Sequence, residues 1–124
     1  MAKQLKYAKK TKTRKIDYSI EKYPPLIRLK RSLTTENLWI YILSLLSKKP
    51  KSKLHGYTLS EEIEKKFKWK PGFITPYIVI YRLESEGYVK SVQKGRRVEY
   101  KITKKGRNAL KDAKKIITET YKSI

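Results

Sequence analysis

The sequence contains no cysteine, one histidine and few carboxylates, and these shortages exclude several classes of protein. Without cysteine there can be no disulfide and no thiolate metal site, so a reducing compartment is the natural location. Asp and Glu number 11 against 32 Lys and Arg, and most of the carboxylates are interspersed with lysines. Such a pattern indicates neither an acid–base pair nor a metal-binding cluster. We therefore expect a protein that is not an enzyme and that needs no cofactor or metal.

Long apolar runs, lipidation motifs and glycine-rich phosphate loops are also missing. The opening residues, "MAKQLKYAKK", lack the apolar segment of a signal peptide. These absences predict a cytoplasmic protein without a membrane partner. Amides are rare while Lys, Ile and Tyr are frequent, a usage typical either of thermophiles or of AT-rich codon bias.

Positive charge is what the sequence has in excess, with a formal net charge of +21 over 124 residues. This imbalance implies a polyanionic partner, with nucleic acid as the first candidate and an anionic membrane surface as the second. The first 15 residues contain basic side chains and no acid, which predicts a basic arm. Its candidate DNA-binding residues are Lys9, Lys10, Lys12, Arg14 and Lys15. The alternative is a disordered tail that only keeps the protein soluble.

Helical spacing predicts most of the secondary structure. A short helix is expected over 16–23, stopped by Pro24 and Pro25 and followed by a connector. The first secure helix is expected to begin at Thr34 or Thr35 and to end by residue 49. It is apolar on two faces: one carries Leu38, Ile42, Leu45 and Leu46, and the other carries Trp39, Ile40 and Leu43. A helix of this kind is usually buried on both sides. The core can cover one face, and a partner subunit is a candidate for the other.

Two further helices follow a loop. Thr58 and Glu61 have the spacing of a capping box at the start of the second helix, over 59–67. The third helix is expected over 75–86, with Gly87 as a left-handed C-terminal cap. On it we expect Tyr77, Ile80 and Leu83 to face the core.

A β-hairpin and a last helix complete the pattern. The segments "YVKSVQ" and "RVEYKI" flank Lys94-Gly95, which suits a two-residue turn. In that register Val89 would face Tyr100, and Lys90 would face Glu99. Thr103 can cap a final helix over 104–122. The sequence predicts a mainly α winged helix-turn-helix fold, with a three-helix core, a β-hairpin wing and a C-terminal helix. The expected domains are the arm and connector (1–31), the winged helix-turn-helix (32–103) and the C-terminal helix (104–124).

Four short motifs occur in this order at fairly specific spacing. "HGY" opens the second helix, Thr75-x-Tyr77 opens the third, "RLESEG" closes it, and "YKITKKG" follows the wing. In these motifs the sequence resembles the PadR family of transcriptional regulators over about residues 36–111. The resemblance implies a homodimeric winged-helix DNA-binding protein, usually a repressor, with its recognition helix at 75–86 and its wing at 88–102. It also implies that the C-terminal helix contributes to the dimer.

The candidate DNA contacts lie on the third helix and on the wing. Thr75 can bind a phosphate or a base edge, Ile78 can pack on thymine methyl groups, and Arg82 can reach a guanine or a phosphate. Tyr77 belongs either to the core or to a phosphate contact, and Val79 is a weaker candidate. The cations Lys94, Arg96 and Arg97 at the wing tip suit the DNA backbone or a narrow minor groove, and Lys70 suits a phosphate.

The remaining candidates concern the dimer. We expect Trp39, Leu43, Leu110, Ala113, Ile117 and Tyr121 at the subunit interface. His55 is expected to cap or pack at a helix start, and Trp69 to pack at a hinge. The leading hypothesis is a sequence-specific regulator of double-stranded DNA, with an architectural DNA-binding protein or an RNA-binding winged helix as alternatives. The sequence identifies no small-molecule effector, operator or target gene.

Overall fold

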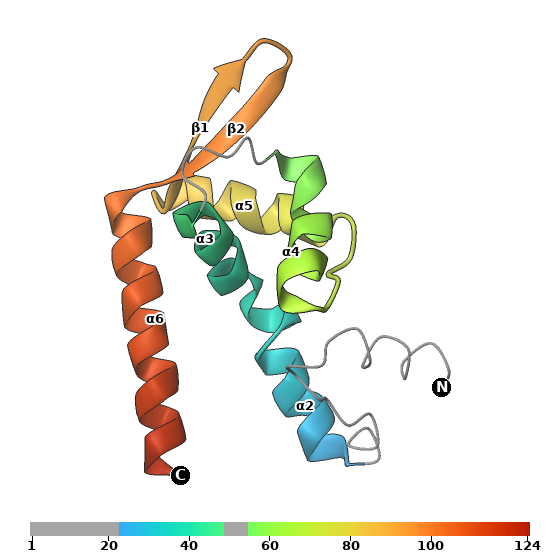
Figure 1. Cartoon of the computed structure of the whole chain (residues 1–124), viewed down its shortest axis with the longest axis vertical. Coiled ribbons are helices and arrows are strands. Elements are labelled where there is room, and N and C mark those ends of the chain that lie inside the picture. The colour runs from blue at the N-terminus through green and yellow to red at the C-terminus, as the bar shows by residue number, and fades with distance from the viewer. Residues whose placement is uncertain (1–22, 49–54) are drawn as a thin grey trace. The chain divides into compact units, whose positions relative to one another are not determined.

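The computed structural model describes residues 23–48 and 55–124 (Figure 1). These residues belong to two compact units, with the boundary between Asn37 and Leu38. The candidate arm residues, from Lys9 to Lys15, lie outside the described residues, as does nearly all of the helix expected over 16–23.

The first unit contains helix α2, Pro24–Ser32, followed by a short 3-10 helix, η2, Thr35–Asn37. The connector expected after Pro24 and Pro25 is a helix instead, and the two prolines stand in its first turn. Amide groups in the first turn have no partner within the helix, so proline costs no hydrogen bond there. Thr34 does not cap the next helix. Its hydroxyl instead donates to the Lys30 carbonyl, at 2.7 Å, and so completes the end of α2.

The second unit is built around helix α3, Leu38–Lys48. Its other elements are η3, Gly56–Thr58; α4, Leu59–Phe67; α5, Thr75–Ser85; β1, Val89–Lys94; β2, Arg97–Ile102; and α6, Lys104–Ser123. Helix α3 contacts α4, α5, α6 and β2. The unit is therefore mainly helical, with a two-stranded antiparallel hairpin and a long C-terminal helix (Figure 1), as predicted.

The apolar core explains why α3 has apolar residues on two faces. Leu38, Ile42 and Leu43 are all at most 1% exposed, and they pack with Leu59, Ile63, Ile80, Val89 and Leu110 from the surrounding elements. Burying side chains of this size removes each from water at a gain of about 1.5–3 kcal/mol. The other elements of the unit thus cover both faces of α3.

Two helix ends show how local hydrogen bonds position the elements. At the end of α5, the Tyr88 amide donates to the Leu83 carbonyl at 2.8 Å and the Gly87 amide donates to the Glu84 carbonyl at 3.0 Å. Gly87 has a φ of 87°, so the predicted left-handed cap is confirmed. The predicted capping box at the start of α4 is wrong, because Thr58 caps no helix amide there.

Thr58 is engaged with His55 instead. The Thr58 hydroxyl donates to the His55 carbonyl at 2.9 Å, and the His55 amide is 3.2 Å from the Thr58 hydroxyl oxygen. This exchange closes the 3-10 turn η3 in front of α4, which leaves no free hydroxyl for the helix that follows.

The register of the hairpin, called the wing below, differs from the prediction by two residues. Val89 pairs with Ile102, Lys90 with Lys101 and Lys94 with Arg97, so the turn is Gly95-Arg96. Gly95 has a φ of 63°, and a two-residue turn of this kind requires glycine at the first central position. The shift of two preserves the faces, and Tyr100 and Ile102 are buried as expected.

Helix α6 begins at the predicted cap, since the Thr103 hydroxyl accepts a hydrogen bond from the Gly106 amide at 3.1 Å. Its buried residues are Gly106, Leu110 and Ala113, so the helix loses its cover halfway along. Within the described ranges, no helix combines the length and apolarity that a membrane crossing needs.

Candidate nucleic-acid interface

Helix α5 presents one face to the core and one to solvent. Pro76, Ile80 and Leu83 are buried, at a spacing that turns the opposite side outward. Exposed side chains continue from the N-terminal flank of the helix onto this side: Phe73 is 71% exposed, Ile74, the N-cap, 66%, Ile78 54% and Tyr81 56%, and Arg82 is also exposed. We call these five residues the reading face, because the sequence predicts that this helix is a recognition helix, which meets base edges.

The prediction placed this face partly correctly. Ile78 and Arg82 are exposed as expected, whereas Thr75 and Tyr77 are half-buried. Val79 is also half-buried and packs against the core. Phe73, Ile74 and Tyr81 were missed, although Ile74, Ile78, Tyr81 and Ser85 follow the same helical spacing. The reason is Pro76, which takes the core position assigned to Tyr77.

Tyr77 connects the helix to the "HGY" turn. Its ring lies against Gly56, where an added Cβ would be 2.6 Å from the Tyr77 Cε1 atom. It also stands between Phe73 and Tyr81, with ring centroids 6.2 and 6.4 Å away. An aromatic row therefore runs along α5, and glycine at position 56 gives it room.

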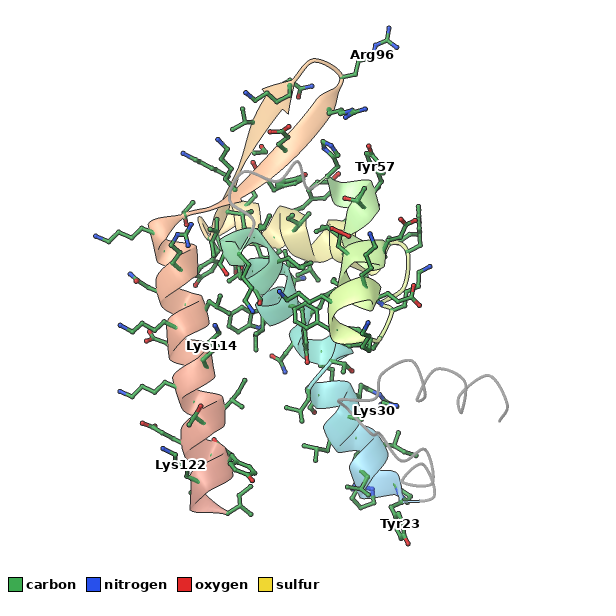
Figure 2. All side chains as sticks on the ribbon, viewed as in Figure 1. Tyr23, Lys30, Tyr57, Arg96, Lys114 and Lys122 are labelled. Carbon is green, nitrogen blue, oxygen red and sulfur yellow. The ribbon has the colours of Figure 1, made fainter. Side chains whose placement is uncertain are left out.

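The same turn also holds the wing. His55 is buried, and its Nδ1 atom is 3.2 Å from the Val98 carbonyl oxygen on β2. Its ring stacks on Tyr57 at 5.3 Å, with the planes 8° apart. Tyr57 is 54% exposed and lies at the side of the wing base in Figure 2. His55 thus packs at a helix start, as expected, and Tyr57 is a further exposed aromatic near the candidate interface.

A second set of contacts ties the wing to α5. The Ser91 hydroxyl on β1 donates to the Glu84 carboxylate. Burial raises the pKa of the Tyr100 hydroxyl on β2, and nearby Tyr81, Glu84 and Tyr77 raise it further. A tyrosine hydroxyl with an ordinary pKa of about 10 is already protonated at neutral pH, so the shift leaves Tyr100 uncharged.

The outer face of the wing carries two pairs of cations, one on either side of the Val92–Glu99 pair. Lys90 lies directly opposite Lys101, and Lys94 lies directly opposite Arg97. All four side chains are exposed, and Arg96 extends from the tip (Figure 2). Like charges opposite one another destabilise a strand pair, so this arrangement suits a face that meets a polyanion. Lys90 and Lys101 were missed because the expected register paired Lys90 with Glu99.

Two other predicted residues lie in the α4–α5 connection. Lys70 is exposed there, as a phosphate contact requires. Trp69 packs edge-on against Tyr41, with ring centroids 5.1 Å apart, and its buried Nε1 atom has no hydrogen-bond partner among the residues that the structure describes. Its role is the packing one that the sequence suggests.

The predicted dimer residues divide by burial. Leu43, Leu110 and Ala113 are at most 7% exposed within a single chain, so the chain's own core covers them and leaves little of their surface for a second subunit. Trp39 is half-buried against that core. Ile117 is 46% and Tyr121 80% exposed, and Ile116 beside them is 64% exposed. These three lie on the half of α6 without buried residues.

Known transcriptional regulators share both sequence and fold with this chain. Residues 42–112 match the sequence model of the transcriptional regulator PadR-like family. A solved transcriptional regulator from Clostridium thermocellum is 29% identical, with a TM-score of 0.62 over 81% of this chain and 91% of that one. A putative transcriptional regulator from Thermoplasma acidophilum is 27% identical, with a TM-score of 0.51 over 73% and 93% of the two chains.

A PadR family transcriptional regulator from Eggerthella lenta shares the fold at 21% identity. The TM-score is 0.63 over 86% of this chain and 90% of that one. Among curated protein sequences, none matches this chain.

Proposed function

The chain belongs to the PadR-like family of transcriptional regulators, and we propose that it acts as a homodimeric repressor of specific sites on duplex DNA. Membership makes it a DNA-binding regulator and not an enzyme. The proposal adds the dimer, the docking mode and the sign of regulation. It also places the protein in the cytoplasm, bound to the nucleoid.

The single observation that carries the docking mode is that the unit with the reading face also carries the cations of the wing, which Ser91 joins to Glu84 of α5. Helix α5 enters the major groove, where Arg82 and the apolar residues meet base edges. The wing follows the backbone or a narrow minor groove with Lys94, Arg96 and Arg97. Backbone cations supply most of the affinity, and α5 supplies selectivity.

The dimer is supported by α6. Its second half has no buried residue, yet it carries Ile116, Ile117 and Tyr121 exposed. A two-fold pairing of these side chains with those of a second chain would bury them. Two α5 helices would then reach successive major grooves about 34 Å apart, which predicts a pseudo-palindromic site. Repression is the simpler mode, because it needs only occupancy of the site, whereas activation also needs a surface for the polymerase.

Selection from random duplex DNA, followed by footprinting at physiological salt, tests the proposal. A reproducible inverted repeat is the expected result. Protection along the whole duplex without any motif would contradict the specific repressor and favour an architectural DNA-binding protein. A preference for structured RNA would contradict both of these hypotheses. A promoter reporter carrying the selected site should lose expression when the protein is present. A gain of expression would show that the protein is an activator and not a repressor.

Light scattering tests the dimer separately. The full chain should scatter as a dimer at micromolar concentration. Ile117→Glu places a charge on the proposed contact and should yield monomers, whereas Thr118→Glu, an exposed neighbour on the same helix, should remain dimeric. A monomeric unaltered chain would remove the argument for two half-sites.

A further inference from the structure

The reading face offers apolar groups where most contacts to base edges need hydrogen bonds. Over residues 73–82, "FITPYIVIYR", the only charged side chain is Arg82, and there is no Asn, Gln or Lys. Those residue types and Arg supply most specific hydrogen bonds in the major groove. Phe73, Ile74 and Ile78 are nevertheless more than half exposed. Hydrogen bonding by this helix can therefore read few base pairs.

The major groove carries one apolar group, the 5-methyl group of thymine. We propose that Ile74 and Ile78 read thymine methyl groups in each half-site, an inference that rests on the proposed function. Ile74 is the N-cap of α5, with helical backbone angles, and Ile78 lies four residues further on, about 6 Å along the axis. That distance corresponds to about two base-pair steps. Arg82, one turn beyond Ile78, is left to read a guanine or a phosphate.

Phe73, Ile74 and Ile78 form an apolar patch, and its surroundings favour DNA over a protein partner. The cations Lys94, Arg96 and Arg97 are on the wing that joins α5 through Ser91 and Glu84. Within residues 73–86 the carboxylates are confined to the C-terminal end, at Glu84 and Glu86. A phosphate backbone over the cations thus brings base edges to the patch without repulsion. When isoleucine packs on a methyl group, both apolar groups leave water. When it packs on a polar base edge, that edge loses its hydrogen bonds to water and gains none.

Deoxyuridine tests the inference, because it lacks only the 5-methyl group of thymine. The probe is the duplex enriched by selection, made once with thymine and once with deoxyuridine in the half-sites, and titrated with the full chain at one salt concentration. Affinity should fall about fourfold for each contacted methyl group, the factor expected for one buried carbon of this size. Deoxyuridine outside the half-sites should change nothing.

The outcomes separate this inference from the proposed function. Equal affinity for the two duplexes would overturn methyl reading and leave sequence-specific DNA binding intact. If selection gave no motif, the proposed function itself would fail before this experiment began.

A variant identifies the residue that makes the contact. Ile78→Ala should lose discrimination at one thymine, so that the substitution in the protein and that in the DNA are not additive. Ile124→Ala makes the same change at a side chain that is 98% exposed outside α5, and it should keep the full difference. If Ile78→Ala changed the oligomeric state by light scattering and left thymine discrimination intact, the face would be a protein contact and the inference wrong.

Discussion

The carbonyl oxygen of Tyr88 lies so close to Gly106 that no side chain fits between them. The same carbonyl accepts a hydrogen bond from the Thr103 amide at 3.1 Å, and the Thr103 hydroxyl donates to the Gly87 carbonyl at 2.7 Å. Lys105 adds a bond from its Nζ atom to the Glu86 carbonyl, also at 2.7 Å. The start of α6 is thereby joined to the turn between α5 and the wing.

Gly106→Ala should destabilise the fold by about 1–3 kcal/mol, the usual cost of overpacking. The added Cβ would meet the Tyr88 backbone and come within 2.8 Å of the Ile102 Cγ1 atom, and backbone cannot move aside as a side chain can. Urea denaturation measures the change. Gly72→Ala is the matched control, because its nearest atom would be the Thr75 hydroxyl oxygen at 3.5 Å. Equal stability of the two variants would contradict the close packing.

Lys101→Glu should raise stability and lower DNA affinity together. It replaces a like-charge pair with Lys90 by an opposite-charge pair, worth about 0.2–1 kcal/mol on a strand pair. It also places a negative charge on the face that is proposed to meet phosphates. Thermal unfolding and binding titrations measure the two effects. Lys115→Glu, on an exposed position of α6, should change neither by as much. A loss of stability in Lys101→Glu would argue against the register.

Arg82→Ala should relax selectivity at one base pair, at a cost of about 1–3 kcal/mol on the selected site and much less on other duplexes. Competition between the selected and a scrambled duplex gives the ratio. Arg107→Ala removes the same exposed group from α6 and should leave the ratio unchanged. An equal loss on both duplexes would instead assign Arg82 to a phosphate.

Replacing Lys94, Arg96 and Arg97 together by alanine should weaken binding to every duplex. The plot of log affinity against log salt concentration should become shallower by about 0.9 for each phosphate that the wing no longer neutralises. The charge-matched control is the replacement of Lys114, Lys115 and Lys122 on α6, all exposed, which should retain the original slope. A wing variant with an unchanged slope would show that the wing does not touch the backbone.

Sequence patterns predicted the fold because apolar spacing and caps act locally. The three core helices, the wing and the caps at Gly87 and Thr103 follow from spacing within a few residues. The register of the wing depended instead on which side of Gly95 the turn lies, and one glycine fits either choice. Pro76 was missed as a core residue because proline in the first helical turn needs no amide partner and can face inward.

The motifs behind the family resemblance turn out to hold the framework together. Gly56 makes room for Tyr77, Gly87 ends α5, and Thr103 with Gly106 starts α6. Several candidate DNA contacts, among them Ile74, Ile78 and the wing-tip cations, lie outside these motifs. This is why the fold could be predicted more fully than the reading face.

The hydrogen bonds of Thr103 also couple the orientation of α6 to that of α5 and the wing. A change in the angle of α6 would strain or break its bonds to the carbonyls of Gly87 and Tyr88, which lie between α5 and the wing. In the proposed dimer, the C-terminal end of α6 would be held by the second chain, so the length and angle of α6 would fix the distance between the two α5 helices. That distance would set the preferred spacing of the operator half-sites. A change in the angle of α6 would therefore lower the affinity for a site of fixed spacing.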